Sequence, residues 1–229
     1  MRIDKFLSQM KFCTRNEVKK FLKIHEVKID DLIITSQQTH VDPLAQKIYV
    51  DGKLIYYEDP IHLMLNKPKG YISALKDKLY PSVINLISAP YDRFDFKIVG
   101  RLDVDTEGLL ILTTDGQFLH EITHPNYHLP KTYEVILDKP LEDAKSLLEG
   151  VMIEDGHKNL YLARALNIEC DKEKAWITID EGKFHQVKRM FKEIGYHVLY
   201  LKRIQIGNLK LKDLKIGELR QINRSDIYD

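Results

Sequence analysis

The chain has 229 residues, of which 44% are hydrophobic and 30% are charged, and its net charge at pH 7 is +1. This balance is typical of a globular protein, and the length allows one large domain or two unequal domains. The longest apolar runs are too short to cross a bilayer, the N-terminus lacks a secretory signal, and the two cysteines have neither metal-ligand nor disulfide spacing, so we expect a cytoplasmic protein.

The first part of the chain predicts two short helices followed by a small curled sheet. Apolar residues at helical spacing predict a helix over residues 3–10, and Thr14 with Glu17 three places later predicts a capping box that begins a second helix. Short strand-like runs follow, and Asp51-Gly52 marks a tight turn between two of them. The polar, proline-bearing segment 58–60 is the best linker in the chain, so we expect domains at 1–58 and 61–229.

Basic side chains gather in two places, although the net charge is close to zero. Eight lie among the first 28 residues, against three acidic ones: Arg2, Lys5, Lys11, Arg15, Lys19, Lys20, Lys23 and Lys28. A second group lies near the C-terminus: Lys183, His185, Lys188, Arg189 and Lys192. Such runs are most often solvated helix faces, and a surface that binds phosphates is the less common interpretation.

The remainder of the chain predicts an α+β domain. The strand-like runs are 62–65, 133–137, 175–179, 198–203 and 209–211, and the helical patterns are 117–122, 141–149 and 185–194. Strands and helices do not alternate strictly. The pattern therefore favours a mixed, largely antiparallel sheet flanked by helices over a doubly wound parallel sheet.

The most informative run is 99–116, in which glycines bracket a charged turn and an apolar strand. This pattern places Arg101, Asp103 and Asp105 on a constrained loop beside a sheet, where a reactive carboxylate can be held in place. The residues alone leave three interpretations of Asp103 and Asp105: a solvated turn, a divalent-metal site, or a nucleophile.

A second candidate metal site is the series His120, His124 and His128, which recur every fourth residue. On a continuous helix they would form one metal-binding face. Pro125 and Pro130 interrupt such a helix, so packing or RNA contacts are favoured and we expect no metal.

The first 58 residues resemble the S4 RNA-binding module. Arg2-Ile3-Asp4-Lys5-Phe6-Leu7 matches its opening pattern, and the match continues through 14–18 to 27–29. The chain departs from the module at His25, where a turn glycine is usual, and at Asp30-Asp31, where Asn-Gly is usual. The resemblance implies an α/β module that binds RNA.

The larger domain resembles pseudouridine synthases of the type that modifies ribosomal RNA. Gly100-Arg101-Leu102-Asp103 matches their GRLD signature, and three further motifs occur in the expected order at 65–70, 131–133 and 181–191. Together the four motifs span most of the domain. The chain is most similar to the family members that modify 16S ribosomal RNA at 115–117, His120, 122–123, Pro125, 131–133 and 185–191.

The resemblance implies roles for individual residues. Asp103 would be the nucleophile, Tyr133 would stack on the target base and exchange a proton at C5, and Lys188 would keep Asp103 ionised, with Arg101 as the second candidate for that cation. The residues expected to bind substrate are Arg101, Lys67, Arg189, Arg15 and Lys19. No cofactor is implied.

The expected function is therefore conversion of uridine to pseudouridine in ribosomal RNA, with a site in 16S RNA as the expected target. The protein is expected to be a monomer. Three alternatives stay open. They are a synthase that acts on 23S RNA, a non-catalytic RNA-binding or ribosome-assembly factor, and a metal-dependent phosphotransferase that uses Asp103 and Asp105. The last of these lacks a phosphate-binding glycine loop.

Overall fold

The computed structural model describes residues 1–123 and 129–228, so two members of the histidine series, His124 and His128, lie outside the described residues. By its contacts the chain divides into two units. The first unit comprises residues 1–61 together with 87–96, and the second comprises 62–86 with the chain from residue 97 onward. The expected division into 1–58 and 61–229 assigned the segment 87–96 to the larger domain.

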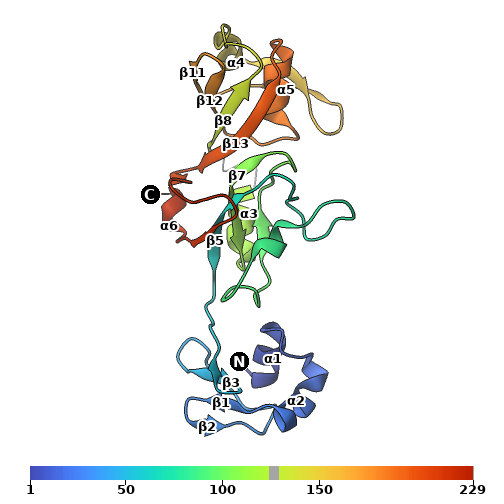
Figure 1. The fold of residues 1–229 in the computed structure, drawn as a ribbon, viewed down its shortest axis with the longest axis vertical. Helices are drawn as coiled ribbons and strands as arrows, with labels where there is room; N and C mark the ends of the chain where they lie inside the picture. The colour runs from blue at the N-terminus through green and yellow to red at the C-terminus, as the bar shows by residue number, and fades with distance from the viewer. Residues whose placement is uncertain (124–128, 229) are drawn as a thin grey trace. The chain divides into compact units, whose positions relative to one another are not determined.

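The first unit begins with helices and continues with a four-stranded antiparallel sheet (Figure 1). The helices are α1 (Ile3–Gln9), the 3-10 helix η1 (Arg15–Glu17) and α2 (Val18–Ile24). The strands β1 (Val27–Ile29), β2 (Leu32–Ile33), β3 (Ile48–Val50) and β4 (Lys53–Leu54) pair in the order β2-β1-β3-β4. The predicted capping box is present, since the Thr14 amide donates to the Glu17 carboxylate at 2.9 Å.

The segment 87–96 joins the first unit through cations. The Lys11 ammonium donates to the carbonyl of Phe94 at 3.0 Å. The Arg93 guanidinium donates to the carbonyl of Met10 at 3.1 Å and lies 4.0 Å from the ring centroid of Phe12. These contacts connect residues more than 80 positions apart, which no local pattern in the sequence records.

The second unit is built on a nine-stranded sheet in the order β11-β12-β8-β13-β7-β5-β15, with β14 added to β13 and β6 added to β7. Its strands are β5 (His62–Lys67), β6 (Lys97–Val99), β7 (Glu107–Thr113), β8 (Lys131–Leu137), β11 (Asn167–Asp171), β12 (Lys174–Ile179), β13 (Val198–Ile206), β14 (Leu209–Lys210) and β15 (Leu219–Gln221). Only the contact between β13 and β7 is parallel within the described part of this sheet. The α+β class and the mixed, largely antiparallel sheet are confirmed.

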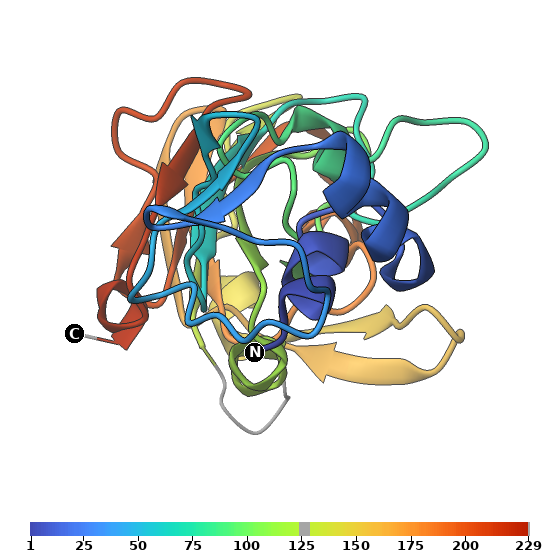
Figure 2. The same ribbon diagram turned by 90° about the horizontal axis from the view of Figure 1, so that it is seen from below.

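Helices flank this sheet, and a separate hairpin stands beside it (Figure 2). The helical elements are η2 (Val83–Leu86), α3 (Gly116–Thr123), α4 (Lys145–Glu149), α5 (Gln186–Glu193) and α6 (Ser225–Tyr228), and the hairpin consists of β9 (Val151–Glu154) and β10 (Leu160–Ala163). The helix expected over 141–149 is shorter, because only its last five residues are helical. Among the described residues no helix has the length and apolarity that a membrane crossing requires.

The core of the second unit lies around β5 and β7. Every residue of β5 is buried, and β7 is buried from Gly108 to its end. Leu109 and Ile111 of β7 pack with Phe118 of α3 and Ile206 of β13. Burial of such side chains contributes about 1.5–3 kcal/mol each relative to exposure. This core fixes the end of β5 and the start of β7, between which the loop 100–106 is held.

Gly108 permits the parallel contact between β7 and β13. Its φ is +106°, and a Cβ atom there would lie 2.2 Å from the carbonyl oxygen of Arg203. Any side chain would therefore force the two strands apart. Gly108, one of the glycines in the run 99–116, is therefore needed because two backbones approach each other closely at this position.

Candidate active site

The loop 100–106 connects β6 to β7 and carries both candidate carboxylates. Gly100 begins it with a φ of +72°, a conformation that L side chains rarely adopt. The amide of Thr106 donates to the carbonyl of Asp103 at 3.1 Å, which closes a turn. The amide of Gly70 donates to the carbonyl of Val104 at 2.8 Å and ties this turn to the segment after β5.

Lys67 supports the loop 100–106 through hydrogen bonds to its backbone. Its side chain is 0% exposed, and its ammonium donates to the carbonyls of Pro68, Asp103 and Thr106 at 3.1, 2.9 and 2.8 Å. Burial lowers the pKa of Lys67 to about 8, although the nearby carboxylates of Asp103 and Asp105 oppose this shift. Lys67 was expected to bind substrate. In the structure its ammonium supports the loop instead, because all three of its hydrogens have backbone acceptors.

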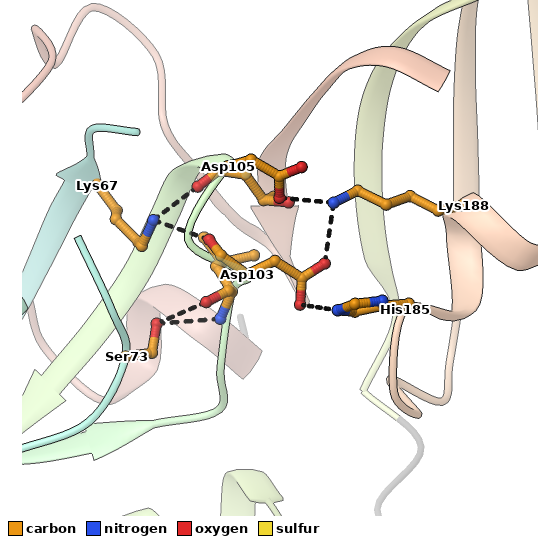
Figure 3. A network of polar contacts seen from close by, with 8 residues as sticks. Lys67, Ser73, Asp103, Asp105, His185 and Lys188 are labelled. Atoms are coloured by element: carbon orange, nitrogen blue, oxygen red, sulfur yellow. Dashed lines mark hydrogen bonds and ion pairs between the residues drawn. The ribbon is translucent and has the colours of Figure 1, made fainter. Parts of the chain in front are cut away.

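Ser73 holds the same loop from a second side. Its hydroxyl donates to the carbonyl of Leu102 at 3.0 Å and accepts from the Leu102 amide at 3.1 Å. Both contacts are drawn in Figure 3. The backbone next to Asp103 is therefore fixed on both sides before any substrate binds.

Both oxygens of the Asp103 carboxylate have a nitrogen partner (Figure 3). The Lys188 ammonium donates to Oδ2 at 3.1 Å, and Nε2 of His185 lies 3.3 Å from Oδ1. Lys188 belongs to the first turn of α5, and His185 precedes that helix in the left-handed conformation, with a φ of 54°. The side chain of Asp103 is 28% exposed, so its carboxylate is held in place by these two contacts and is still open to solvent.

Asp105 shares the same ammonium but faces solvent. Its Oδ1 lies 2.6 Å from Nζ of Lys188, and its side chain is 64% exposed. Burial raises the pKa of Asp105, but the hydrogen bond and the charge of Lys188 outweigh this and the pKa lies below its usual value. The Lys188 ammonium stands between the two carboxylates, in the place a bridging metal ion would need. No group of three potential ligands suited to a metal is found in the described part of the chain.

Tyr133 of β8 lies beside the carboxylate. It is 6% exposed, and it lines a hollow of about 50 Å³ together with Asp103, His185 and Leu201. Its neighbour across the sheet is Arg203 of β13. The structure thus brings together Asp103, Tyr133 and Lys188, the three residues expected to be catalytic.

The remaining expected substrate-binding residues lie in different places. Arg101 is exposed and lines the hollow. Arg189 of α5 donates to the carbonyls of Glu154 and Asp155, at 2.8 Å for the latter, and so ties the helix to the β9–β10 hairpin. Arg15 and Lys19 belong to the first unit and are exposed there.

His185 and Ser73 are the contacts with the Asp103 loop that sequence reasoning missed. His185 was noticed as a basic residue and as part of the motif 181–191 but was given no role, and Ser73 carried no signal. The ring of Phe184 stacks on that of His185, with centroids 3.8 Å apart and an interplanar angle of 20°. The position of His185 one turn before Lys188, at the start of a predicted helix, was the available signal that both side chains face the same partner.

Comparisons with known proteins agree over nearly the whole chain. The profile of the family described as RNA pseudouridylate synthase matches residues 61–193. The chain is 39% identical to an uncharacterised RNA pseudouridine synthase of Bacillus subtilis, over 100% of this chain and 97% of that protein. It is 35% identical to the ribosomal small subunit pseudouridine synthase A of Escherichia coli K12, over 99% of this chain and 98% of that protein. The crystal structure of a pseudouridylate synthase superposes with a TM-score of 0.66 at 36% identity, covering 99% of this chain and 98% of that one.

Proposed function

Because this chain belongs to the RNA pseudouridylate synthase family, we propose that it converts uridine to pseudouridine in the RNA of the small ribosomal subunit, with Asp103 as the nucleophile. The observation that carries the proposal is the Asp103 carboxylate, held at both oxygens by Lys188 and His185 beside Tyr133. The names of several similar proteins, among them that of Escherichia coli, support the small-subunit RNA as substrate.

The reaction breaks the C–N bond between the ribose C1′ and the uracil, turns the base, and joins C1′ to C5. An ionised carboxylate suits this task because it can form and release a covalent adduct, at C1′ or on the base, or assist elimination to a glycal. The Lys188 ammonium and the His185 ring nitrogen, one at each carboxylate oxygen, orient this carboxylate in a partly desolvated hollow. Flipping of the uridine out of the RNA stack is required before Asp103 can reach it.

Tyr133 supplies a ring and a phenol at the edge of the hollow. We assign its ring to stacking on the flipped base, a contact typically worth about 1–3 kcal/mol. Its phenol is assigned to exchange of the proton at C5 once the new bond has formed: the oxygen accepts the C5 proton while its own O–H proton passes to solvent. Replacement by phenylalanine would keep the ring and remove that proton acceptor.

The first unit is proposed to be an S4-like module that holds the RNA. Its cations are exposed, as contacts with phosphates require, and Arg15 and Lys19 lie on η1 and α2. We assign binding of RNA to this unit and chemistry to the second one.

The test uses purified protein with transcribed 16S and 23S RNA in excess EDTA, followed by mapping of pseudouridine at single-nucleotide resolution. We expect one modified uridine in 16S RNA and an unchanged rate in EDTA. Product only in 23S RNA would move the substrate to the large subunit. No product in either RNA, with retained RNA binding, would favour an assembly factor. Phosphate transfer that EDTA abolishes, in place of pseudouridine formation, would favour a phosphotransferase.

A further inference from the structure

A cavity of about 300 Å³ adjoins the hollow at Asp103. The two spaces share Arg101, Tyr133, Gly182 and Lys183 as lining residues. An apolar wall is formed by Val99, Ile122, Leu129 and Ile206. The volume is at the lower end of the range of about 300–1,000 Å³ that small-molecule sites occupy. A single heterocyclic base on a ribose at Asp103 would therefore find room here.

Lys131 brings a cation to this cavity. Its ammonium donates to the carbonyls of Leu129 and Asp180 at 2.7 and 3.1 Å. An ammonium has three N–H groups, so one donor is left over among the described contacts. Burial, together with the charge of Arg203, lowers the pKa of Lys131 to about 8, and the charge of Asp180 opposes this shift.

Arg203 is a second cation on the cavity lining and is 3% exposed. Its Nε donates to the carbonyl of Leu109 at 2.8 Å, and its Nη1 donates to that of Arg101 at 3.4 Å. Its Nη2 is buried and has no acceptor in the part of the chain that the structure describes. A buried donor without an acceptor is destabilising, so an acceptor on a ligand would be favoured at this position.

Neither cation is within ion-pair distance of a carboxylate among residues 1–123 and 129–228. The carboxylates of Asp180 and Glu181 also line the cavity, and that of Glu181 is already bound to Gln186 and Lys183. Beside the apolar wall, Lys131 and Arg203 leave hydrogen-bond donors. Next to these two donors a carbonyl oxygen of a flat ring is favoured over an amino group, because two donors would otherwise face each other.

We propose that this cavity receives the uracil of the target uridine and that Lys131, supported by Arg203, binds O4 of the uracil and so discriminates uracil from cytosine. The inference rests on the proposed function and names the specificity-determining residue of the same site. Uracil presents an acceptor at O4, whereas cytosine presents an amino donor at that position. The cavity also retains the base after the C–N bond breaks, while it turns beside Tyr133.

The test measures binding of two RNA fragments that differ only at the target position, uridine or cytidine. The Asp103→Asn protein is used so that neither fragment reacts. We expect the uridine fragment to bind about tenfold more tightly, as one satisfied rather than unsatisfied buried donor implies. Addition of Lys131→Met should reduce this ratio to near one, while Lys131→Arg should retain most of it.

The matched control is Lys174→Met, which removes an ammonium that pairs with Glu134 instead of lining the cavity. This substitution should leave the ratio unchanged.

A second variant, Thr123→Tyr, tests the cavity if Lys131→Met does not fold. Thr123 is exposed on the cavity lining, so the larger ring should fill the space and reduce the ratio at an unchanged melting temperature.

A ratio that persists in folded Lys131→Met, or in Thr123→Tyr when Lys131→Met is unfolded, would overturn the inference. Equal binding of the two fragments in the Asp103→Asn background would do the same. Failure of the proposed function is a separate result, because it would appear as absence of pseudouridine when the wild-type protein is incubated with the uridine fragment.

Discussion

The cations of the two units differ in burial and in partners. In the second unit the Lys67 side chain is 0% exposed and binds three carbonyls, and Lys188 is bound to two carboxylates. In the first unit the Arg15 side chain is 57% exposed, and it pairs with Asp4 at 3.4 Å. Exposed ion pairs contribute little to stability, typically about 0–1 kcal/mol. Lys67 and Lys188, which are bound to several oxygens, therefore fix geometry, while exposed cations such as Arg15 remain available for phosphates.

This difference predicts that rate and RNA affinity can be changed separately, and the largest effect falls on the rate. Asp103→Asn removes the nucleophile at constant volume, so pseudouridine formation should fall below about one per cent of wild type, against the many orders of magnitude that enzymes supply. RNA affinity and the melting temperature should be nearly unchanged. Asp105→Asn is the matched control and should be milder, because Asp105 is 64% exposed. If the two substitutions reduced the single-turnover rate equally, the interpretation of Asp103 and Asp105 as a divalent-metal site would be favoured again.

The second prediction compares the two partners of the carboxylate. Lys188→Met removes a hydrogen bond between charged groups, worth about 1.5–3 kcal/mol, so the rate should fall about ten- to hundredfold. His185→Gln retains a donor and should cost less than tenfold. Single-turnover rates under saturating protein separate these effects from RNA binding. A larger loss of rate in His185→Gln than in Lys188→Met would show that Lys188 is not the main partner of the Asp103 carboxylate.

A smaller effect, on stability, is expected from Lys67→Met. Three carbonyls lose their donor, so the free energy of unfolding at pH 7 should fall by about 1–3 kcal/mol. The pKa of Lys67 is about 8 in the folded protein and near 10.5 when unfolded, so between these values the unfolded chain binds more protons and the contribution of Lys67 to stability rises with pH.

Denaturant titrations at pH 7, 8 and 10 measure this dependence. The gap between the wild type and Lys67→Met should widen from pH 8 to pH 10. Lys174→Met is the control, because its ammonium is exposed and its loss should leave the pH profile unchanged. A gap that narrows over this range would show that Lys67 is not buried as an ammonium.

The smallest effect is expected from the first unit. Arg15→Gln combined with Lys19→Gln should weaken RNA binding several-fold and reduce the slope of log affinity against log salt by about one for each phosphate that is no longer bound. The rate at saturating protein should not change. Lys145→Gln, which removes an exposed lysine from the second unit, serves as the control. An unchanged slope in the double variant would show that these cations do not bind RNA phosphates.

Much of the fold follows from local patterns, and some of it does not. The buried strand β7 was visible as an apolar run after a glycine, and the mixed sheet was visible as strands without regular alternation. The role of Lys67 was not visible, because a lysine before Pro-Lys-Gly is typical of a surface turn. The structure shows instead that Lys67 ends β5, pairs with Gly108 of β7 and is buried.

The candidate site divides in the same way. Asp103, Tyr133 and Lys188 were identified by family motifs. His185 lies in the same motif as Lys188, but its contact with Asp103 was not predicted, and Ser73, which contacts the loop 100–106, lies outside the motifs. The packing of residues 87–96 with the first unit depends on contacts more than 80 residues apart. Such contacts are fixed by tertiary structure, and a single sequence carries no local signal for them.

The most direct test of the account is the pseudouridine content of small-subunit RNA in cells that lack this gene. We predict that one uridine of 16S RNA loses its modification, that the wild-type gene restores it, and that a gene carrying Asp103→Asn, expressed at the same level, does not. Full modification in the absence of the gene, or restoration by the Asp103→Asn protein, would contradict the account.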